Sequence, residues 1–232
     1  MRILALDTAT EACSVALLEG ERCESRYEEI GRGHAERILP MVQEVLTAAG
    51  VALKDVDAIA VGRGPGAFTG VRIGVSVAQG LAFGAGKRVV PVSNLAALAA
   101  RVMQEQGAAT VLACLDARMQ EVYWGVYERD SALVRLSGEE HVGPARTVRL
   151  PAGDDWHGAG SGWTLPELQR HALAQGAPLE GRVHPALWPR AQEIAQLAVP
   201  LFAGGHAVPP ECALPVYLRD RVAHPMSQKS RT

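Results

Sequence analysis

The sequence is poor in aromatic residues and contains no block of basic residues. Aromatic side chains make up 5% of its 232 residues, and 23 Lys and Arg stand against 25 Asp and Glu, so the formal net charge is −2. A protein that coats a nucleic acid needs clustered Lys and Arg to neutralise phosphates, and this composition excludes that class. Any nucleic acid that the protein serves is therefore expected to be held mainly by a partner.

Cysteine pairs, histidine pairs and long apolar runs are also missing. The four cysteines form no C-x-x-C motif, and the seven histidines include no pair on adjacent helical turns. No stretch of about 18 apolar residues is present to span a membrane, and the N-terminal apolar run ends at Asp7, short of the ~7–15 residues of a signal-peptide core. We expect a cytoplasmic protein with no membrane segment, no disulfide bond and no metal ion of its own.

What the sequence does contain, over residues 1–106, is a regular alternation of strand and helix patterns. Hydrophobic residues make up 48% of the chain, and the length suits one large or two small domains. Three short runs at the start predict an antiparallel meander, and the spacing of apolar residues after Gly33 predicts a helix that stops at Gly50. The expected order is βββαβαβα, with strands over 3–6, 12–18 and 22–30, a helix over 34–49, a strand over 56–61, a helix over 70–84, a strand over 89–92 and a helix over 94–106.

A repeat then begins. Val111–Asp116 has the same pattern as Ile3–Asp7, a buried-type strand that ends in Asp, 109 positions further on. Residues 122–128 fall opposite residues 13–19 in the same way, and a third strand is expected over 132–136. A period of this length indicates a duplicated domain rather than a solenoid. We therefore expect two related lobes.

The rest of the chain is less regular. Residues 138–162 are rich in Gly, Pro and polar residues and predict loops, whereas helices are expected over 165–173 and 188–202. We divide the chain into an N-terminal lobe over 1–105 joined by a helix over 188–205, a C-terminal lobe over 106–187, and a tail over 206–232. The tail is expected to be disordered after about Arg221.

The strongest local feature is a glycine-rich segment, Gly62–Gly74, between a predicted strand and a predicted helix. Such a turn aims backbone N–H groups at an anion, but the segment has neither the Walker spacing nor the full dinucleotide fingerprint. The alternative is a tight turn whose Gly70 and Gly74 let another element approach closely. Asp7 and Asp116, at strand ends, would hold a hydrated Mg²⁺ against phosphates or, alternatively, cap turns. The candidate phosphate-site residues are Asp7, Thr8, Thr10, Gly64, Gly66 and Thr69.

Several segments together resemble one family. They are Ile3–Thr10, His34–Pro40, Gly64–Gly74 with Ala78–Ala82, and Tyr217–Arg219. The chain is similar over its whole length to the TsaB family of bacterial tRNA threonylcarbamoyladenosine biosynthesis proteins. This resemblance implies an α/β fold of the actin/Hsp70/sugar-kinase type (ASKHA), with two related lobes, each built on a mixed sheet, and a reduced C-terminal lobe.

The resemblance also implies a protein without a catalytic site. TsaB is a paralogue of TsaD, which carries catalysis and holds a metal ion with two histidines. At the matching positions this chain has Leu95 and Ala99, which offer a metal no lone pair. By this comparison Asp7 and the Gly64 loop are remnants of a phosphate site, and the protein has no cofactor of its own, because ATP and metal belong to TsaD and to the small ATPase TsaE.

By the same resemblance, the protein is a scaffold that pairs with TsaD and TsaE for threonylcarbamoyl transfer to N6 of adenosine 37 in tRNAs that read codons starting with A. It would reach the tRNA only through the complex and would form a homodimer when alone. A Gly74→Trp change is expected to weaken pairing and leave the lobe folded. The expected partner interface lies on the helices over 34–49 and 70–85, at His34, Ile38, Met41, Val42, Arg72, Ile73, Gly74, Val77 and Leu81.

A second function stays open at this point. The protein would be a small ATP- and Mg²⁺-dependent phosphotransferase of the kinase type, using Asp7 and the Gly64 loop. Tight Mg-ATP binding that is lost in Asp7→Ala would favour this alternative.

Overall fold

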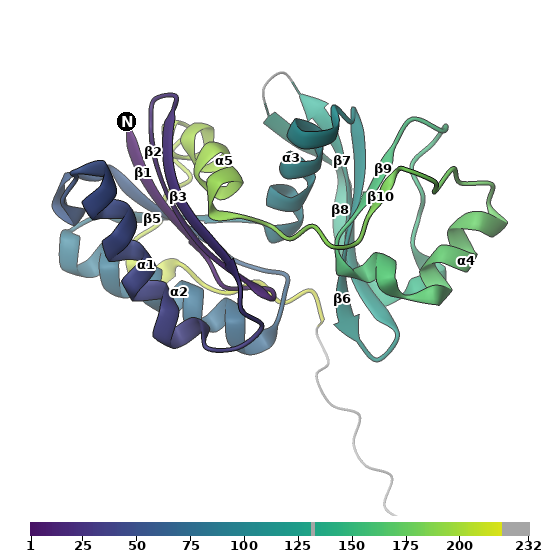
Figure 1. Ribbon diagram of the computed structural model, residues 1–232, viewed down its shortest axis with the longest axis horizontal. Helices are drawn as coiled ribbons and strands as arrows, with labels where there is room; N and C mark the ends of the chain where they lie inside the picture. The colour runs from purple at the N-terminus through teal and green to yellow at the C-terminus, as the bar shows by residue number, and fades with distance from the viewer. Residues whose placement is uncertain (131–132, 220–232) are drawn as a thin grey trace, which may run out of the picture.

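The computed structural model describes residues 1–130 and 133–219 and consists of two lobes that lie side by side (Figure 1). The first lobe has a five-stranded sheet in the order β3-β2-β1-β4-β5. Its strands are β1 (Arg2–Asp7), β2 (Ala12–Glu19), β3 (Arg22–Glu29), β4 (Ala58–Gly62) and β5 (Arg88–Val92). β1 pairs antiparallel with β2 and parallel with β4, so this sheet is mixed.

The second lobe repeats this arrangement. Its strands are β6 (Thr110–Arg118), β7 (Glu121–Asp130), β8 (Leu133–Pro144), β9 (His157–Ala159) and β10 (Val183–His184), in the order β10-β9-β6-β7-β8. β6 pairs antiparallel with β7 and parallel with β9, as β1 does with β2 and β4. The register differs by one residue, because Asp7 pairs with Ser14 whereas Asp116 pairs with Val122.

The common topology confirms the duplication and the predicted actin/Hsp70/sugar-kinase type of fold. Two helices, α1 (His34–Ala49) and α2 (Phe68–Ala85), cover the outer face of the first sheet. The second lobe is reduced, since its outer face carries one short helix, α4 (Pro166–Ala174), and β9 and β10 have only three and two residues.

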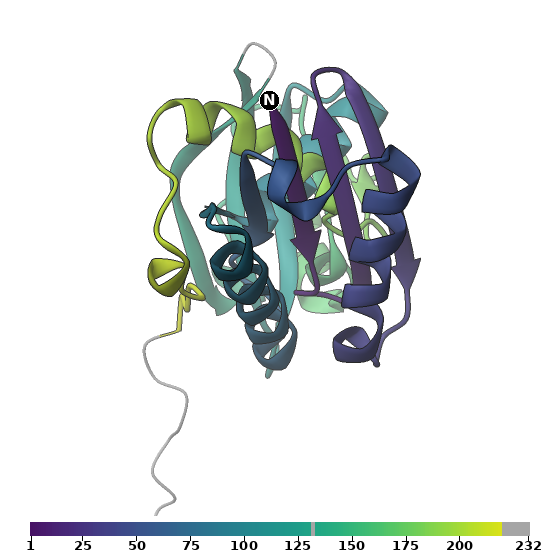
Figure 2. The same cartoon turned by 90° about the vertical axis from the view of Figure 1, so that its left-hand side faces the viewer.

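The two remaining helices lie between the sheets. α5 (Ala191–Ala203) packs its apolar residues on the inner face of the first sheet, and α3 (Asn94–Gln106) packs mainly on the second sheet. α3 and α5 also contact each other, through bonds such as Gln104 Nε2 to Gln196 Oε1 at 2.7 Å. Figure 2, turned by 90°, shows α1 and α2 together in front of the first sheet. The division of the chain near residue 105 stays a prediction.

Two predicted elements have different bounds in the structure. The helix expected from Trp188 begins at Ala191, because the residue before Pro189 is disfavoured in a helix and Arg190 is extended, with φ −126° and ψ 153°. The third strand of the second lobe continues to Pro144, through a segment that we predicted as loop. It is a partly exposed edge strand, so its residues lack the apolar alternation of a buried strand.

Two expectations concern parts of the chain that the structure does not describe. Ala132, the predicted start of the third strand, and the predicted disorder after about Arg221 both lie outside the described residues. Within residues 1–130 and 133–219, no helix has the length and apolar character needed to cross a bilayer.

We expect acid to weaken the β9–β10 pair. His157 Nδ1 lies 2.9 Å from His184 Nε2, and the rings stack with centroids 5.2 Å apart. Burial lowers the pKa of both imidazoles; nearby Arg182 adds to the effect at His157, and His157 adds to it at His184. The unfolded chain then binds more protons than the folded one, so stability is lost as the pH falls below about 6.5.

The measurement is the thermal midpoint of the wild type and of His184→Gln between pH 7.5 and 5. The wild type should lose more stability than the variant over this range. Parallel curves would show that the histidine pair contributes nothing to the acid sensitivity.

Candidate functional site

Asp7 ends β1 and is completely buried, with Asn94 and Gly62 as its neighbours. Its Oδ1 accepts hydrogen bonds from Asn94 Nδ2 at 2.8 Å and from the Ala9 N–H at 3.3 Å. Its Oδ2 is buried and has no hydrogen-bond partner among the described residues. Burial raises the pKa of Asp7 to about 7, although the bonds from Asn94 and the backbone lower it in part. This carboxyl group is therefore shielded from solvent and held by the chain's own groups.

Asn94, the first residue of α3, connects Asp7 to the glycine-rich loop. Its Oδ1 accepts a hydrogen bond from the Gly64 N–H at 2.8 Å while its Nδ2 donates to Asp7. Gly62 lies between them, and a Cβ there would be 2.2 Å from Asp7 Oδ1. Asn94 was not predicted as a site residue from the sequence, and its position two residues after β5, at the start of a helix, was the available signal.

The glycine-rich loop is filled by the turn after β1. A Cβ on Gly66 would lie 2.3 Å from the Ala9 carbonyl oxygen, and one on Gly70 would lie 2.1 Å from the Thr8 carbonyl oxygen. The Thr8 hydroxyl donates to the Gly70 carbonyl oxygen at 2.7 Å. These glycines therefore let the backbone of Thr8 and Ala9 approach, which is the structural alternative to anion binding that the sequence left open.

The other two candidate phosphate-site residues lie at the edges of this contact. Thr10 is buried, and its Oγ1 accepts from the Ala12 N–H at 3.4 Å. Thr69 is exposed in the first turn of α2. The chain's own C-terminal segment also contacts the loop, since the Val216 N–H donates to the Arg63 carbonyl oxygen at 2.8 Å.

The expected interface residues on α1 are not on its free surface. All four of them are buried, namely His34, Ile38, Met41 and Val42. Ile38, Met41 and Val42 belong to the hydrophobic core beneath the helix. Placing them in a partner interface was wrong, because the apolar stripe of an amphipathic helix is the face that its own sheet covers.

The predicted place of Gly74 in the partner interface also needs correction. It is buried, and a Cβ there would lie 2.8 Å from Thr8 Oγ1 and 3.6 Å from Val61 Cγ2. A Gly74→Trp change would therefore disturb the fold of the first lobe itself, contrary to the expectation from sequence.

The free surface of the two helices forms a shallow apolar groove. Phe83 is 82% exposed and Phe68 58% exposed on α2, and Leu39 is exposed on α1. Leu81 lies further along α2 and is half-buried. Arg72, Ile73 and Val77, which were predicted from the sequence, do line this groove. Its complete lining is Ala35, Phe68, Thr69, Arg72, Ile73, Ser76 and Val77.

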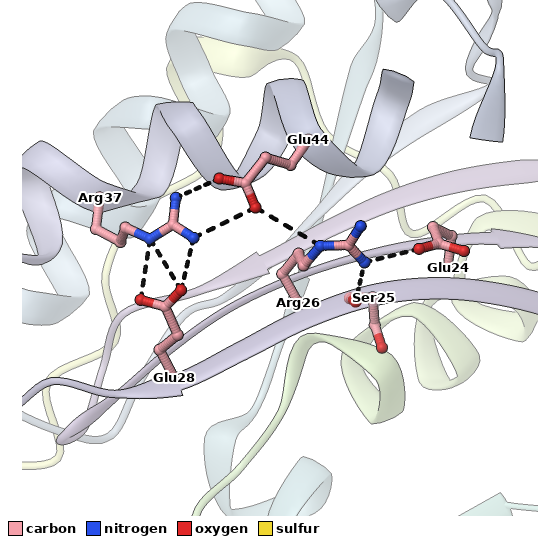
Figure 3. A network of polar contacts seen from close by, with 6 residues as sticks. All are labelled: Glu24, Ser25, Arg26, Glu28, Arg37 and Glu44. Atoms are coloured by element: carbon pink, nitrogen blue, oxygen red, sulfur yellow. Dashed lines mark hydrogen bonds and ion pairs between the residues drawn. The ribbon is translucent and has the colours of Figure 1, made fainter. Parts of the chain in front are cut away.

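An ion-pair network joins α1 to β3 (Figure 3). Arg37 donates from Nε and Nη2 to Glu28 and from Nη1 to Glu44, with Nη2–Oε1 and Nη1–Oε1 distances of 2.6 Å each. The Arg37 guanidinium holds the pKa of both carboxyl groups below their usual range. Arg26 continues the network, at 3.6 Å from Glu44 and 2.7 Å from Glu24. The network thereby adds polar contacts between α1 and the edge strand of the first sheet.

The two positions that the resemblance to TsaD matches with metal ligands are part of an apolar core. Leu95 and Ala99 are completely buried on α3, packed with Val111 and Leu115 of β6. Over residues 1–130 and 133–219, no three His, Cys, Asp or Glu side chains gather in a way that could hold a metal ion.

Comparison with known proteins gives consistent matches over nearly the whole chain. The tRNA threonylcarbamoyladenosine biosynthesis protein TsaB of Escherichia coli is 45% identical, over 96% of both chains, and that of Haemophilus influenzae is 38% identical, over 96% of this chain and 95% of the relative. A solved structure of YeaZ from Pseudomonas aeruginosa has 51% identity and a TM-score of 0.85, and the match covers 94% of this chain and 99% of that one.

The family model that matches is described as TsaD, tRNA N6-adenosine threonylcarbamoyltransferase, and it covers residues 27–175. The chain therefore belongs to the family that this model defines and, within it, to the tRNA threonylcarbamoyladenosine biosynthesis proteins of the TsaB type.

Proposed function

We propose that this protein is a non-catalytic scaffold subunit that pairs with TsaD and TsaE in the cytoplasm. The complex would transfer the threonylcarbamoyl group to N6 of adenosine 37 in tRNAs that read codons starting with A. The names of its relatives place them in threonylcarbamoyladenosine biosynthesis, which supports this pathway for the chain.

The observation that carries the proposal is the apolar groove on α1 and α2. Phe68, Ile73 and Val77 line it, and Phe68 is more than half exposed. An apolar surface of this kind marks a contact with another protein. We propose that TsaD covers this groove in the complex. In the absence of TsaD, a second copy of the chain would cover it in a two-fold homodimer, the commonest symmetry of such contacts.

The inside of the molecule supports a non-catalytic role. Leu95 and Ala99 fill an apolar core where TsaD would have metal ligands, and Asp7 is completely buried. A kinase-type reaction would need Asp7 open to Mg-ATP and a free glycine-rich loop, whereas the Thr8–Ala9 backbone occupies that loop. The phosphotransferase alternative is therefore not favoured. ATP and metal would belong to TsaD and TsaE, and the tRNA would be held through the complex.

Phe68→Asp is expected to weaken pairing with TsaD about 100-fold. The change removes the exposed aromatic ring and puts in its place a carboxylate that binding must take out of water, and a 100-fold loss corresponds to about 3 kcal/mol. Asp in the first turn of a helix is favourable for the helix itself, so the lobe should stay folded. The measurement is a binding titration with purified TsaD, supported by light scattering.

The matched control is Leu173→Asp on α4, where Leu173 is 59% exposed but lies in the other lobe. This variant should bind TsaD like the wild type. A folded Phe68→Asp variant with unchanged affinity would show that the groove is not the TsaD contact.

A further inference from the structure

The β6–β7 hairpin has a strained tip. Arg118, Met119 and Gln120 have φ values of 64°, 56° and 63°. They are the only non-glycine residues with positive φ in the part of the chain that the structure describes, whereas thirteen glycines take such a conformation. The left-handed conformation is unfavourable for a residue with a Cβ, and such strain persists only where the surroundings enforce it.

The surroundings of the tip hold it on both sides. Asp116 accepts hydrogen bonds from the Arg118 N–H at 2.8 Å and from Arg118 Nη1 at 3.1 Å. The Gln120 carbonyl oxygen accepts from the Ala145 N–H at 3.3 Å. Arg219 donates to the Ala117 carbonyl oxygen at 3.3 Å and to the Glu121 carboxylate. The tip therefore has a defined shape before anything binds to it.

This rigid tip displays an apolar side chain. Met119 is 77% exposed at its apex. The charges around it are paired, Arg118 with Asp116 and Arg219 with Glu121, so no surplus positive charge is available for nucleic-acid phosphates. An exposed Met on a rigid loop is instead suited to a protein contact, since Met is enriched in such interfaces and adapts its shape to a pocket.

The same C-terminal segment that holds the tip also contacts the groove on α1 and α2. Tyr217 lies two residues before Arg219, and its ring centroid is 6.1 Å from that of Phe68. The Arg72 guanidinium lies over both rings, at 3.2 Å from the Phe68 centroid and 4.8 Å from the Tyr217 centroid. In Figure 1 this segment runs from α2 to the lower end of β6. The C-terminal segment thus connects Phe68, through Tyr217 and Arg219, to the base of the β6–β7 hairpin.

The groove is too small to form a stable interface alone. It is lined by seven residues, whereas a standard interface uses about 20–30 residues on each side. A partner seated on the groove must therefore contact more of this surface. Tyr217, which is exposed beside Phe68, and the hairpin tip that Arg219 contacts extend this surface.

We propose that the hairpin tip, residues 117–121, is a second contact for the partner that covers the groove, with Met119 entering an apolar pocket of that partner. This inference rests on the proposed function, and the occupant is the TsaD-type subunit. The hydrogen bonds that join the tip to Asp116, Ala145 and Arg219 hold the hairpin in one shape, so binding does not require the loop to become ordered.

Two glycine variants distinguish the effect of backbone strain on partner binding from the effect of the Met119 side chain. Met119→Gly relieves strain and removes the apolar side chain, whereas Gln120→Gly relieves strain and keeps Met119. Both should raise the thermal midpoint, because Gly adopts positive φ freely. In a titration with purified TsaD, Met119→Gly should raise the dissociation constant about tenfold, and Gln120→Gly should leave it unchanged. A third variant, Met119→Asn, tolerates the left-handed conformation and should weaken binding like Met119→Gly.

The outcomes distinguish this inference from the proposed function. Wild-type affinity in both Met119→Gly and Met119→Asn would overturn the inference, while loss of binding in Phe68→Asp in the same experiment would leave the proposed function standing. Wild-type affinity in Phe68→Asp as well, or no binding by the unaltered chain, would overturn the proposed function itself. An equal loss of affinity in Gln120→Gly would show that strain, and not the Met119 side chain, matters, and would also overturn the inference.

Discussion

Asp7→Asn is expected to make the protein more stable above pH 7. The pKa of Asp7 is raised from 3.8 to about 7 by burial, so the folded protein binds a proton there more tightly than the unfolded chain does. The stability that this proton contributes is complete below pH 3.8 and is lost as the pH rises through about 7. A shift of this size corresponds to roughly 4 kcal/mol of destabilisation at pH 8, which the neutral Asn side chain would avoid.

The measurement is denaturant unfolding of the wild type and of Asp7→Asn at pH 4, 6 and 8. The free energy of unfolding of Asp7→Asn, relative to that of the wild type, should increase with pH. Asp116→Asn is the matched control, because Asp116 stands at the equivalent position of β6 in the second lobe but is partly exposed and paired with Arg118. A stability difference between the two proteins that stays the same from pH 4 to pH 8 would show that Asp7 does not change its protonation in the folded protein over this range.

Gly70→Ala is expected to destabilise the first lobe by about 3 kcal/mol or more. A Cβ on Gly70 would lie 2.1 Å from the Thr8 carbonyl oxygen, which is backbone and cannot rotate away. Overpacking usually costs about 1–3 kcal/mol, and here the displacement also breaks the 2.7 Å hydrogen bond from the Thr8 hydroxyl to the Gly70 carbonyl oxygen.

The same helix offers controls for this prediction. Gly80 and Gly84 of α2 have open space where a Cβ would stand. Gly80→Ala and Gly84→Ala should therefore stabilise the protein by about 0.5–1 kcal/mol, as Ala does in a helix interior. Equal stability of Gly70→Ala and Gly80→Ala in denaturant unfolding would contradict the close packing of the glycine-rich loop against the turn after β1.

The fold could be predicted from the sequence because its signals are local or repeated. Strand and helix periodicity indicated most elements, and the recurrence of Ile3–Asp7 as Val111–Asp116 indicated the second lobe, which the matching sheet orders confirm. The bounds near Pro189 and the long edge strand β8 were missed, since a proline boundary and a solvent-facing strand leave little apolar signal.

The candidate site was harder to predict, because its features depend on contacts between distant segments. The periodicity of α1 identifies its apolar stripe, but it does not tell whether a neighbouring chain or the helix's own sheet covers that stripe, and Ile38 proved to be in the core. A glycine-rich loop allows either the binding of an anion or the close approach of another backbone segment. Only the structure, in which the Thr8 carbonyl oxygen lies against Gly70, distinguishes the two. The left-handed conformation at the hairpin tip had no local signal in the sequence, because none of Arg118, Met119 and Gln120 is a Gly or Asn.

The most direct test of the central claim is a tRNA modification assay with purified TsaD, TsaE, threonylcarbamoyl-adenylate, ATP and tRNA, with and without this chain. A non-catalytic partner subunit predicts no modification by the chain alone, a defined complex with TsaD, and modification that depends on the chain. Full modification by TsaD and TsaE without the chain, or Mg-ATP turnover by a chain that does not pair with TsaD, would contradict the account.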